Sequence, residues 1–138
     1  MRTASDIMST DIVKVPADMT VRVLARLLDQ KEISGAPVVD RMGNLVGVVS
    51  STDIARAVGE RAGTELDRLT AASIMTTGAF TVHPNATIAE VAGFLARAGV
   101  HRALVMDYDR LLGIVSANDV LAVVGHIEEM PHPAHWPR

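Results

Sequence analysis

The sequence predicts an α/β (α+β) fold that consists of two copies of one β-α-β-β-α unit. The first observation is an internal repeat, in which matching residues such as Ile7 and Ile74 lie 67 positions apart. The second is that Gly47–Ile54 (GVVSSTDI) matches Gly113–Val120 (GIVSANDV) at a spacing of 66. The third is the length of 138 residues, because half a chain of this size would bury only about 60 % of its unfolded surface. The two copies are therefore expected to pack together.

The predicted division of the chain follows this repeat. The first repeat covers residues 1–62, a connecting segment covers 63–72, and the second repeat covers 73–126. The remaining segment, 127–138, contains three prolines. It is expected to form an irregular tail, because proline interrupts both helices and strands.

Each repeat is expected to begin with a short strand and an amphipathic helix. The strands are Ile12–Val15 and Phe80–Val82, and each is followed by a proline that closes it. Thr20 and Thr87 stand where helix N-caps are expected, and Glu90 has the spacing of a capping box with Thr87. The helices have one apolar face at the helical period. Its residues are Val21, Leu24, Leu27 and Leu28 in the first repeat, and Ile88, Val91, Phe94 and Leu95 in the second.

Each repeat then continues with a pair of strands and a second helix. Short polar or glycine-containing loops separate apolar runs, which is the pattern of a β-hairpin. A helical pattern follows from about Thr52 and from about Asn118. The predicted strands are Ala36–Asp40 and Leu45–Ser50 in the first repeat, and Ala103–Asp107 and Leu111–Ser116 in the second.

Composition and charge exclude several classes of protein. The net charge is −3, whereas a protein that binds nucleic-acid backbones needs a basic surface. The chain has no run of about 20 apolar residues, the length that a membrane-spanning helix requires. Its N-terminus lacks the apolar centre of a signal peptide, and there is no cysteine. We therefore expect a cytoplasmic protein whose partners include neither nucleic acid nor a membrane.

The sequence contains no recognisable catalytic centre. There is neither a G-x-G-x-x-G motif nor a P-loop, and no nucleophile has an adjacent base. His126, His132 and His135 lack acidic or thiol partners at metal-ligand spacing, so no metal site is expected. The sequence therefore predicts a protein that is not an enzyme and requires no cofactor.

The most informative residues are Ser50 and Asp53 and their copies, Ser116 and Asp119. Each serine ends an apolar run, and each aspartate falls in the first turn of the next helix, where backbone N–H groups are unpaired. Such a helix start suits an anionic or hydroxyl-rich ligand, and a nearby carboxylate can accept two hydrogen bonds from a ribose diol. The same spacing is also that of a simple N-cap. Both interpretations stay open, although the repetition of the motif favours a ligand site.

The pattern G-h-h-S-x-x-D-h (h, apolar) occurs twice, each time after an opening D/S-I-M-S/T, and resembles the CBS domain. The resemblance covers roughly residues 3–124. It implies a stand-alone tandem CBS domain pair, in which the repeats pack as a pseudo-twofold pair with two clefts. Such clefts bind adenosyl ligands, namely AMP, ADP, ATP or S-adenosylmethionine, as regulatory ligands. The implied function is a sensor, for example of cellular energy, that signals to an unknown effector protein. The alternative is a ligand-free protein with a structural role in dimerisation or interaction.

The resemblance also implies roles for individual residues. Asp53 and Asp119 are expected to hold the ribose hydroxyl groups. The residues expected near the ribose and the phosphates are Ser50, Ser116, Thr52, Asn118, His101 and Arg102. The residues expected around the adenine are Thr10, Ile12, Val13, Thr77, Ala79, Phe80, Ala36 and Pro37.

The two predicted clefts are not equal. His101–Arg102 stands before the middle strand of the second repeat, where the family often has a basic residue for phosphates, and arginine is a good bidentate phosphate ligand. The first repeat has Ser34–Gly35 at the matching place. One cleft is therefore expected to bind weakly, to accept an uncharged tail or to stay empty. Arg56 is expected to form an i,i+3 ion pair with Asp53, although it could also reach a phosphate.

The last predicted helix indicates a self-association surface. Its residues Val120–Val124 are apolar on every side, whereas a surface helix keeps one polar face. We expect this helix to be covered both by its own repeat and by a partner subunit, so that the protein is a homodimer. The alternative is deep burial of the helix within one chain.

Overall fold

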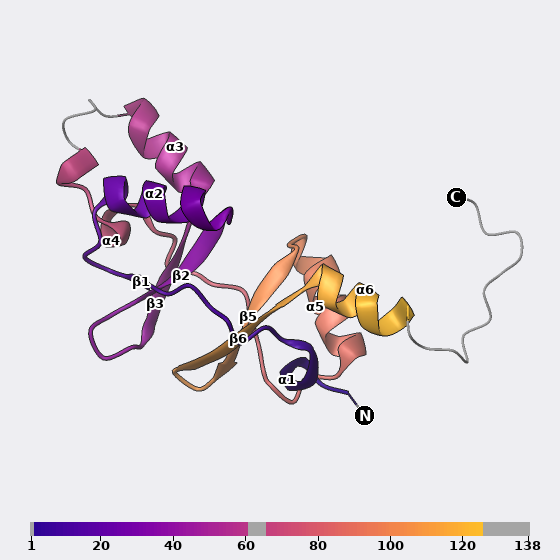
Figure 1. Ribbon diagram of the computed structural model, residues 1–138. Coiled ribbons are helices and arrows are strands. Elements are labelled where there is room, and N and C mark those ends of the chain that lie inside the picture. Colours follow the sequence, from indigo (N-terminus) through magenta and orange to yellow (C-terminus); the bar gives the residue numbers. More distant parts are fainter. Residues whose placement is uncertain (1, 61–65, 126–138) are drawn as a thin grey trace, which may run out of the picture.

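The computed structural model describes residues 2–60 and 66–125 and has two halves of the same architecture, each a three-stranded sheet with helices packed against it (Figure 1). The predicted fold class is confirmed. The first half contains β1 (Val15–Pro16), α2 (Val21–Lys31), β2 (Gly35–Val39), β3 (Leu45–Ser50) and α3 (Ser51–Glu60). The second half contains β4 (Thr81–Val82), α5 (Ile88–Ala98), β5 (Arg102–Asp107), β6 (Arg110–Ser116) and α6 (Ala117–Gly125). The two remaining helices are α1 (Ala4–Ile7) and α4 (Ala71–Ile74).

Both sheets have the same strand order and the same register. β1 lies parallel to β2, which is antiparallel to β3, and β4, β5 and β6 repeat this arrangement. Val15 pairs with Val38 in the first sheet, and Val82 pairs with Val105 in the second. Because these pairs are 67 positions apart, the sequence repeat is also a structural repeat. The ladders shift register after Val38 and after Val105, so both hairpins are irregular at the same place.

Threonine caps begin the longer helices, as predicted. The Oγ1 atom of Thr20 accepts a hydrogen bond of 3.3 Å from the amide of Val23 in α2. In α5, Thr87 Oγ1 accepts a bond of 3.1 Å from the amide of Glu90, and the Glu90 carboxylate accepts one of 3.0 Å from the amide of Thr87. The hydrogen bond from the Thr87 amide also lowers the pKa of Glu90. These bonds satisfy N–H groups that the first helical turn leaves unpaired.

The two short helices are exchanged between the halves. Ala4 of α1 is fully buried in the core of the second half, together with Val91. Ala71 of α4 is fully buried in the core of the first half, together with Leu24. Figure 1 shows α1 beside β6 and α5, although it begins the chain. Each hydrophobic core therefore needs a helix that precedes the other repeat in the sequence.

A close backbone approach joins each exchanged segment to its sheet. Ser9 and Ile114 exchange two backbone hydrogen bonds of 2.8 and 2.9 Å, and Thr76 pairs with β3 in the same way. A Cβ atom at Gly113 would lie 2.8 Å from the carbonyl oxygen of Ser9, and one at Gly47 would lie 2.7 Å from that of Thr76. The glycine of the repeated motif is therefore required where the exchanged segment crosses the sheet.

The predicted first strand of repeat one is longer than the observed strand. The ladder contains Val15 and Pro16 but not Ile12–Lys14. These residues lead from the second half, where Ser9 pairs with Ile114, to the first half, so most of this stretch has no strand beside it.

Part of the predicted organisation lies outside the described residues. The tail at 127–138, part of the connecting segment and His126 belong there, and the division of the chain into repeats stays a prediction. Within residues 2–60 and 66–125, every helix is too short or too polar to cross a membrane.

The ends of α2 and α5 predict opposite effects for two substitutions. Glu32 ends α2 with a φ of 55°, and its counterpart Gly99 ends α5 with a φ of 68°. Residues with a Cβ atom are strained in this left-handed conformation, so we expect Glu32→Gly to raise the free energy of unfolding by up to about 1 kcal/mol. Gly99→Ala should lower it by about 1 kcal/mol. Urea denaturation checks both, and a destabilised Glu32→Gly variant would contradict the argument.

Candidate ligand site between the repeats

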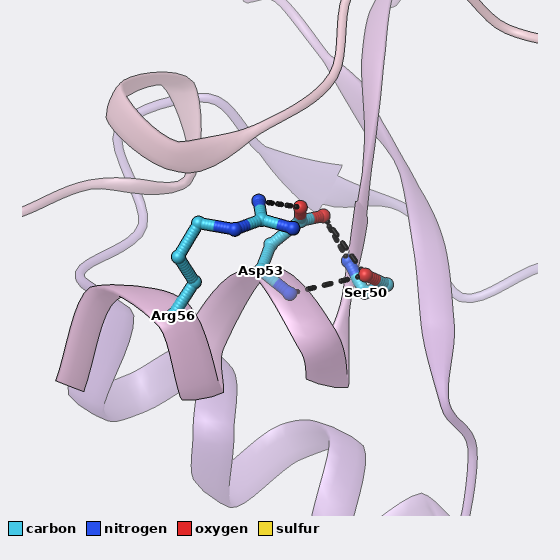
Figure 2. Close-up of polar contacts among 3 residues, drawn as sticks. All are labelled: Ser50, Asp53 and Arg56. Atoms are coloured by element: carbon cyan, nitrogen blue, oxygen red, sulfur yellow. Dashed lines mark hydrogen bonds and ion pairs between the residues drawn. The ribbon is translucent and has the colours of Figure 1, made fainter. Parts of the chain in front are cut away.

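Ser50 and Asp53 form a reciprocal hydrogen-bonded unit where β3 ends and α3 begins. The Oδ2 atom of Asp53 accepts hydrogen bonds from the Ser50 amide (2.8 Å) and from Ser50 Oγ (2.9 Å). The Asp53 amide donates to Ser50 Oγ at 3.2 Å. Figure 2 shows the two side chains facing each other across the first turn of the helix. Ser50 therefore caps the helix, as the N-cap interpretation predicts. Both lone pairs of Asp53 Oδ2 are used by the hydrogen bonds from Ser50.

The second carboxylate oxygen of Asp53 points away from the cap. Its only described protein partner is Arg56, whose Nη1 atom donates to Oδ1 at 3.3 Å (Figure 2). The predicted i,i+3 contact between the two residues is therefore present. The side chain of Asp53 is buried, whereas that of Arg56 is 60 % exposed. Oδ1 keeps one lone pair for a further donor.

The second repeat contains the same cap but lacks the arginine. Asp119 Oδ2 accepts from the Ser116 amide (2.7 Å) and from Ser116 Oγ (2.9 Å), and the Asp119 amide donates to Ser116 Oγ (3.2 Å). At the place of Arg56 the second repeat has Ala122. Asp119 is also more exposed than Asp53, which is 8 % exposed. The two copies therefore share their local backbone chemistry and differ in charge.

A cavity of about 540 Å³ opens beside Asp53 and is lined by residues of both halves. This volume lies within the range of roughly 300–1,000 Å³ that is typical of small-molecule sites. β2, β3 and α3 form its wall in the first half, and β5, β6 and the segment that follows α4 form its wall in the second half. Most of the lining surface is apolar, with few polar groups, which suits a ligand that carries a flat base and a polar tail.

The cavity brings together some of the predicted site residues. Asp53, Ser50 and Thr52 line it from the end of β3 and the start of α3. The other predicted residues that line it are Ala36, Pro37, Phe80 and Arg102. The predicted residues that do not line this cavity are Asp119, Ser116, Asn118, His101, Thr10, Ile12, Val13, Thr77 and Ala79.

Several lining residues were missed by the sequence analysis. Thr76 and Gly78 line the cavity, whereas the predicted neighbours Thr77 and Ala79 do not. Thr76 is held by its backbone pairing with Val48 of β3, and this pairing brings the start of the second repeat to the Asp53 side. The exchange of the short helices therefore explains why the cavity combines Asp53 with residues numbered near 80. No local sequence signal reports this exchange.

The charged residues that line the cavity are two arginines and one aspartate, Arg56, Arg102 and Asp53. This balance is positive in a chain whose net charge is −3. Arg102 belongs to the second repeat but lines the cavity that contains Asp53 of the first. His101 does not line the cavity, and its carbonyl oxygen accepts a hydrogen bond from the amide of Ala117 at the start of α6 (2.8 Å).

The described residues contain no cluster of three or more histidine, cysteine, aspartate or glutamate side chains that could hold a metal ion. His126, His132 and His135 lie outside the described residues. The polar groups that line the cavity include the hydroxyls of Ser50 and Thr52, the guanidinium of Arg56 and the carboxylate of Asp53.

Comparisons with known proteins identify both repeats. The profile of the CBS domain family matches residues 4–60 and 71–126. The CBS domain-containing protein YhcV of Bacillus subtilis is 27 % identical over 123 residues, which cover 87 % of this chain and 84 % of that protein. The L-aspartate semialdehyde sulfurtransferase of Methanocaldococcus jannaschii is 29 % identical over 121 residues. The chain spans only about a quarter of the length of this and the other enzyme-named relatives.

Solved structures show the same fold. The CBS domain pair of protein MJ0100, in complex with 5′-methylthioadenosine and S-adenosyl-L-methionine, has a TM-score of 0.74 and 28 % identity, and the match covers 91 % of this chain and 97 % of that one. CBSX2 in complex with AMP has a TM-score of 0.78 and 26 % identity, and the match covers 92 % of this chain and 98 % of that one. This chain therefore belongs to the CBS domain family, and its two repeats form a CBS domain pair.

Proposed function

We propose that this protein is a regulatory module that binds an adenosyl ligand in the cavity between its two repeats and signals to a partner protein. The observation that carries the proposal is the position of Asp53 Oδ1. Asp53 is buried and lines a cavity of suitable size, and its Oδ1 atom keeps a free lone pair, because the cap occupies only Oδ2.

The ribose would be recognised through one oxygen atom of Asp53. A diol that binds both carboxylate oxygens would have to displace the two hydrogen bonds from Ser50 to Oδ2. A hydroxyl group that donates to Oδ1 leaves the cap intact. Hydrogen bonds to a charged acceptor contribute roughly 1.5–3 kcal/mol, so a single such bond gives substantial affinity.

The adenine would lie against the apolar wall. Ala36 and Pro37 are buried at one side of the cavity, and Phe80, which is 49 % exposed, stands at the other. The ring of Phe80 is held edge-on by Phe94, with the ring centroids 6.2 Å apart. A fixed, half-exposed ring provides a surface on which a purine can stack.

The relatives bind ligands of the same class. The solved CBS pairs carry 5′-methylthioadenosine and S-adenosyl-L-methionine in one case and AMP in the other. All three contain an adenosine-derived group and differ in what the 5′ position carries. We propose the same class for this chain, with AMP, ADP, ATP and S-adenosylmethionine as the candidates.

Signalling would require a partner chain, and α6 offers a surface for one. Leu121 and Val124 of α6 are 68 % and 42 % exposed, and Val58 of α3, the counterpart of Val124, is 49 % exposed. Deep burial of α6 within one chain is therefore wrong for these residues. We propose that they form a homodimer contact and that a separate effector protein responds to the ligand. The ligand can shift the arrangement of the two repeats only if it binds one arrangement more tightly than another.

A thermal-shift panel of AMP, ADP, ATP and S-adenosylmethionine tests the proposal. A ligand at a hundred times its dissociation constant adds about 2.7 kcal/mol to the free energy of unfolding, which raises the melting temperature by several degrees. Asp53→Asn should reduce this shift to less than half for the Asp53 cavity, because the amide keeps an acceptor for Ser50 but cannot accept at the place of Oδ1. Its melting temperature without ligand should remain close to that of the wild type. The ligand-induced shift of the melting temperature in Asp119→Asn, measured separately, tells whether the second copy of the motif also contributes to binding.

The second candidate function is a ligand-free structural or interaction protein. The hydrogen bonds between Ser50 and Asp53 favour it, because they account for the serine and for one carboxylate oxygen without a ligand. It predicts no melting-temperature shift with any nucleotide in the wild-type protein. That result, with a folded wild type and a dimer in solution, would replace the first proposal by the second.

A further inference from the structure

We infer that Arg56 makes the Asp53 cavity selective for adenosyl ligands that carry phosphate, against neutral or cationic adenosyl compounds. The inference rests on the proposed function and specifies the ligand class for one of the two copies. The guanidinium of Arg56 donates to the carboxylate oxygen that would receive the ribose. A ligand with a phosphate can offer this guanidinium a second anionic partner.

The contact between Arg56 and Asp53 is weak enough to be exchanged. Its length is 3.3 Å, and the arginine side chain is 60 % exposed. Ion pairs of such exposure contribute little to stability, because solvent screens them. A phosphate oxygen accepts stronger, charge-assisted hydrogen bonds from a guanidinium, so the arginine gains by moving from the carboxylate to the phosphate.

A second guanidinium reinforces the preference for anions. Arg102 lines the same cavity from the second half, and Asp53 is the negatively charged residue among the lining residues. Two arginines therefore remain to bind a phosphate once a ribose hydroxyl has engaged Asp53. A ligand with a positively charged sulfonium or ammonium group would meet like charges, and a neutral nucleoside would offer the two arginines no anionic partner.

The other copy of the motif lacks this element. Asp119 makes the same cap as Asp53, but the residue one turn later is Ala122, which carries no donor. Oδ1 of Asp119 thus has no counterpart of the Arg56 contact. The phosphate selectivity that depends on this arginine belongs to the Asp53 copy alone, and it follows from one difference between two otherwise matching helix starts.

The test is an NMR titration of the full chain with AMP, adenosine and S-adenosylmethionine. The backbone amide signals of Thr52 and Asp53 report on the first copy, and those of Asn118 and Asp119 report on the second. In the wild type, the Thr52 and Asp53 signals should respond to AMP with at least about tenfold higher affinity than to adenosine, the ratio expected from one charge-assisted contact. S-adenosylmethionine should bind this copy more weakly than AMP.

Arg56→Ala should lower the ratio between the AMP and adenosine affinities by about tenfold or more. The AMP affinity falls because a donor to the phosphate is lost, while the adenosine affinity stays nearly the same because adenosine carries no phosphate for Arg56 to bind. Arg26→Ala is the matched control, since Arg26 is an exposed arginine on α2 that does not line the cavity. It should leave both affinities unchanged.

The outcomes separate the inference from the proposed function. If the wild type binds AMP at Thr52 and Asp53 but Arg56→Ala keeps the same ratio between AMP and adenosine, the inference is wrong and the proposed function stands. If the wild type binds S-adenosylmethionine at this copy as tightly as AMP, the inference is also wrong. If neither set of amide signals responds to any of the three compounds, both fail together.

Discussion

Gly113→Ala is expected to lower the free energy of unfolding by about 3 kcal/mol, since the added methyl group overpacks a backbone crossing and weakens two hydrogen bonds. The new Cβ atom would lie 2.8 Å from the carbonyl oxygen of Ser9. A flexible side chain could move away, but this oxygen belongs to the backbone that pairs with Ile114. Gly47→Ala should have a similar effect, because its Cβ atom would lie 2.7 Å from the carbonyl oxygen of Thr76.

Thermal and urea denaturation measure this effect, and the chain contains a suitable control. Gly59 lies within α3, where an added Cβ atom would meet no other atom within 4 Å. Gly59→Ala should therefore stabilise the protein by roughly 0.5–1 kcal/mol through its higher helix propensity. Equal stabilities of Gly113→Ala and Gly59→Ala would show that the exchanged segment shifts without cost, which would contradict the close approach described for the motif glycine.

Ala4→Asp is expected to disrupt the second half of the protein, although residue 4 lies at the start of the first repeat. Ala4 is fully buried and packs with Val91 and Val105. A carboxylate without partners in such a core costs several kcal/mol, even after its pKa adjusts. Amide hydrogen exchange should show the largest loss of protection in β5 and β6, at residues about 100 positions from the substitution.

Ser5→Asp is the matched control for Ala4→Asp. Ser5 is the next residue of the same helix, and its side chain is exposed. Its backbone amide donates to the carbonyl oxygen of Pro84, and a change of side chain leaves this donor in place. The same new charge should therefore leave the protection of β5 and β6 unchanged. If Ala4→Asp instead exposed β2 and β3 first, the assignment of α1 to the core of the second half would be wrong.

The repeat predicted the fold because its period is preserved in the structure. The strands, the caps at Thr20 and Thr87 and the hairpins follow from local patterns that do not depend on the distant chain. The exchange of α1 and α4 could not be predicted in this way. A spacing of 67 residues is the same whether each short helix packs on its own repeat or on the other one, and Ala4 and Ala71 carry no pattern that distinguishes the two.

The candidate site was predictable only in part for the same reason. The Ser-x-x-Asp spacing indicates both a cap and a ligand site, and only the folded structure shows that Oδ2 serves the cap and that Asp53 also lines the cavity. The combination of Asp53 with Phe80 and Arg102 depends on which segment crosses β3. That is a property of tertiary packing, which neither motif spacing nor helix propensity encodes.

The exchanged helices also determine the order in which this chain can fold. The pairing of Ser9 with Ile114 joins residues near the two ends of the described chain. During synthesis on a ribosome, the first repeat emerges before α4. α1 emerges before β5 and β6, the strands of the core in which it packs. Loops of this length close late and slowly. We therefore expect the core of the first half to form once α4 has emerged, whereas the core of the second half, which includes Ala4 of α1, can form only after β6 has been translated.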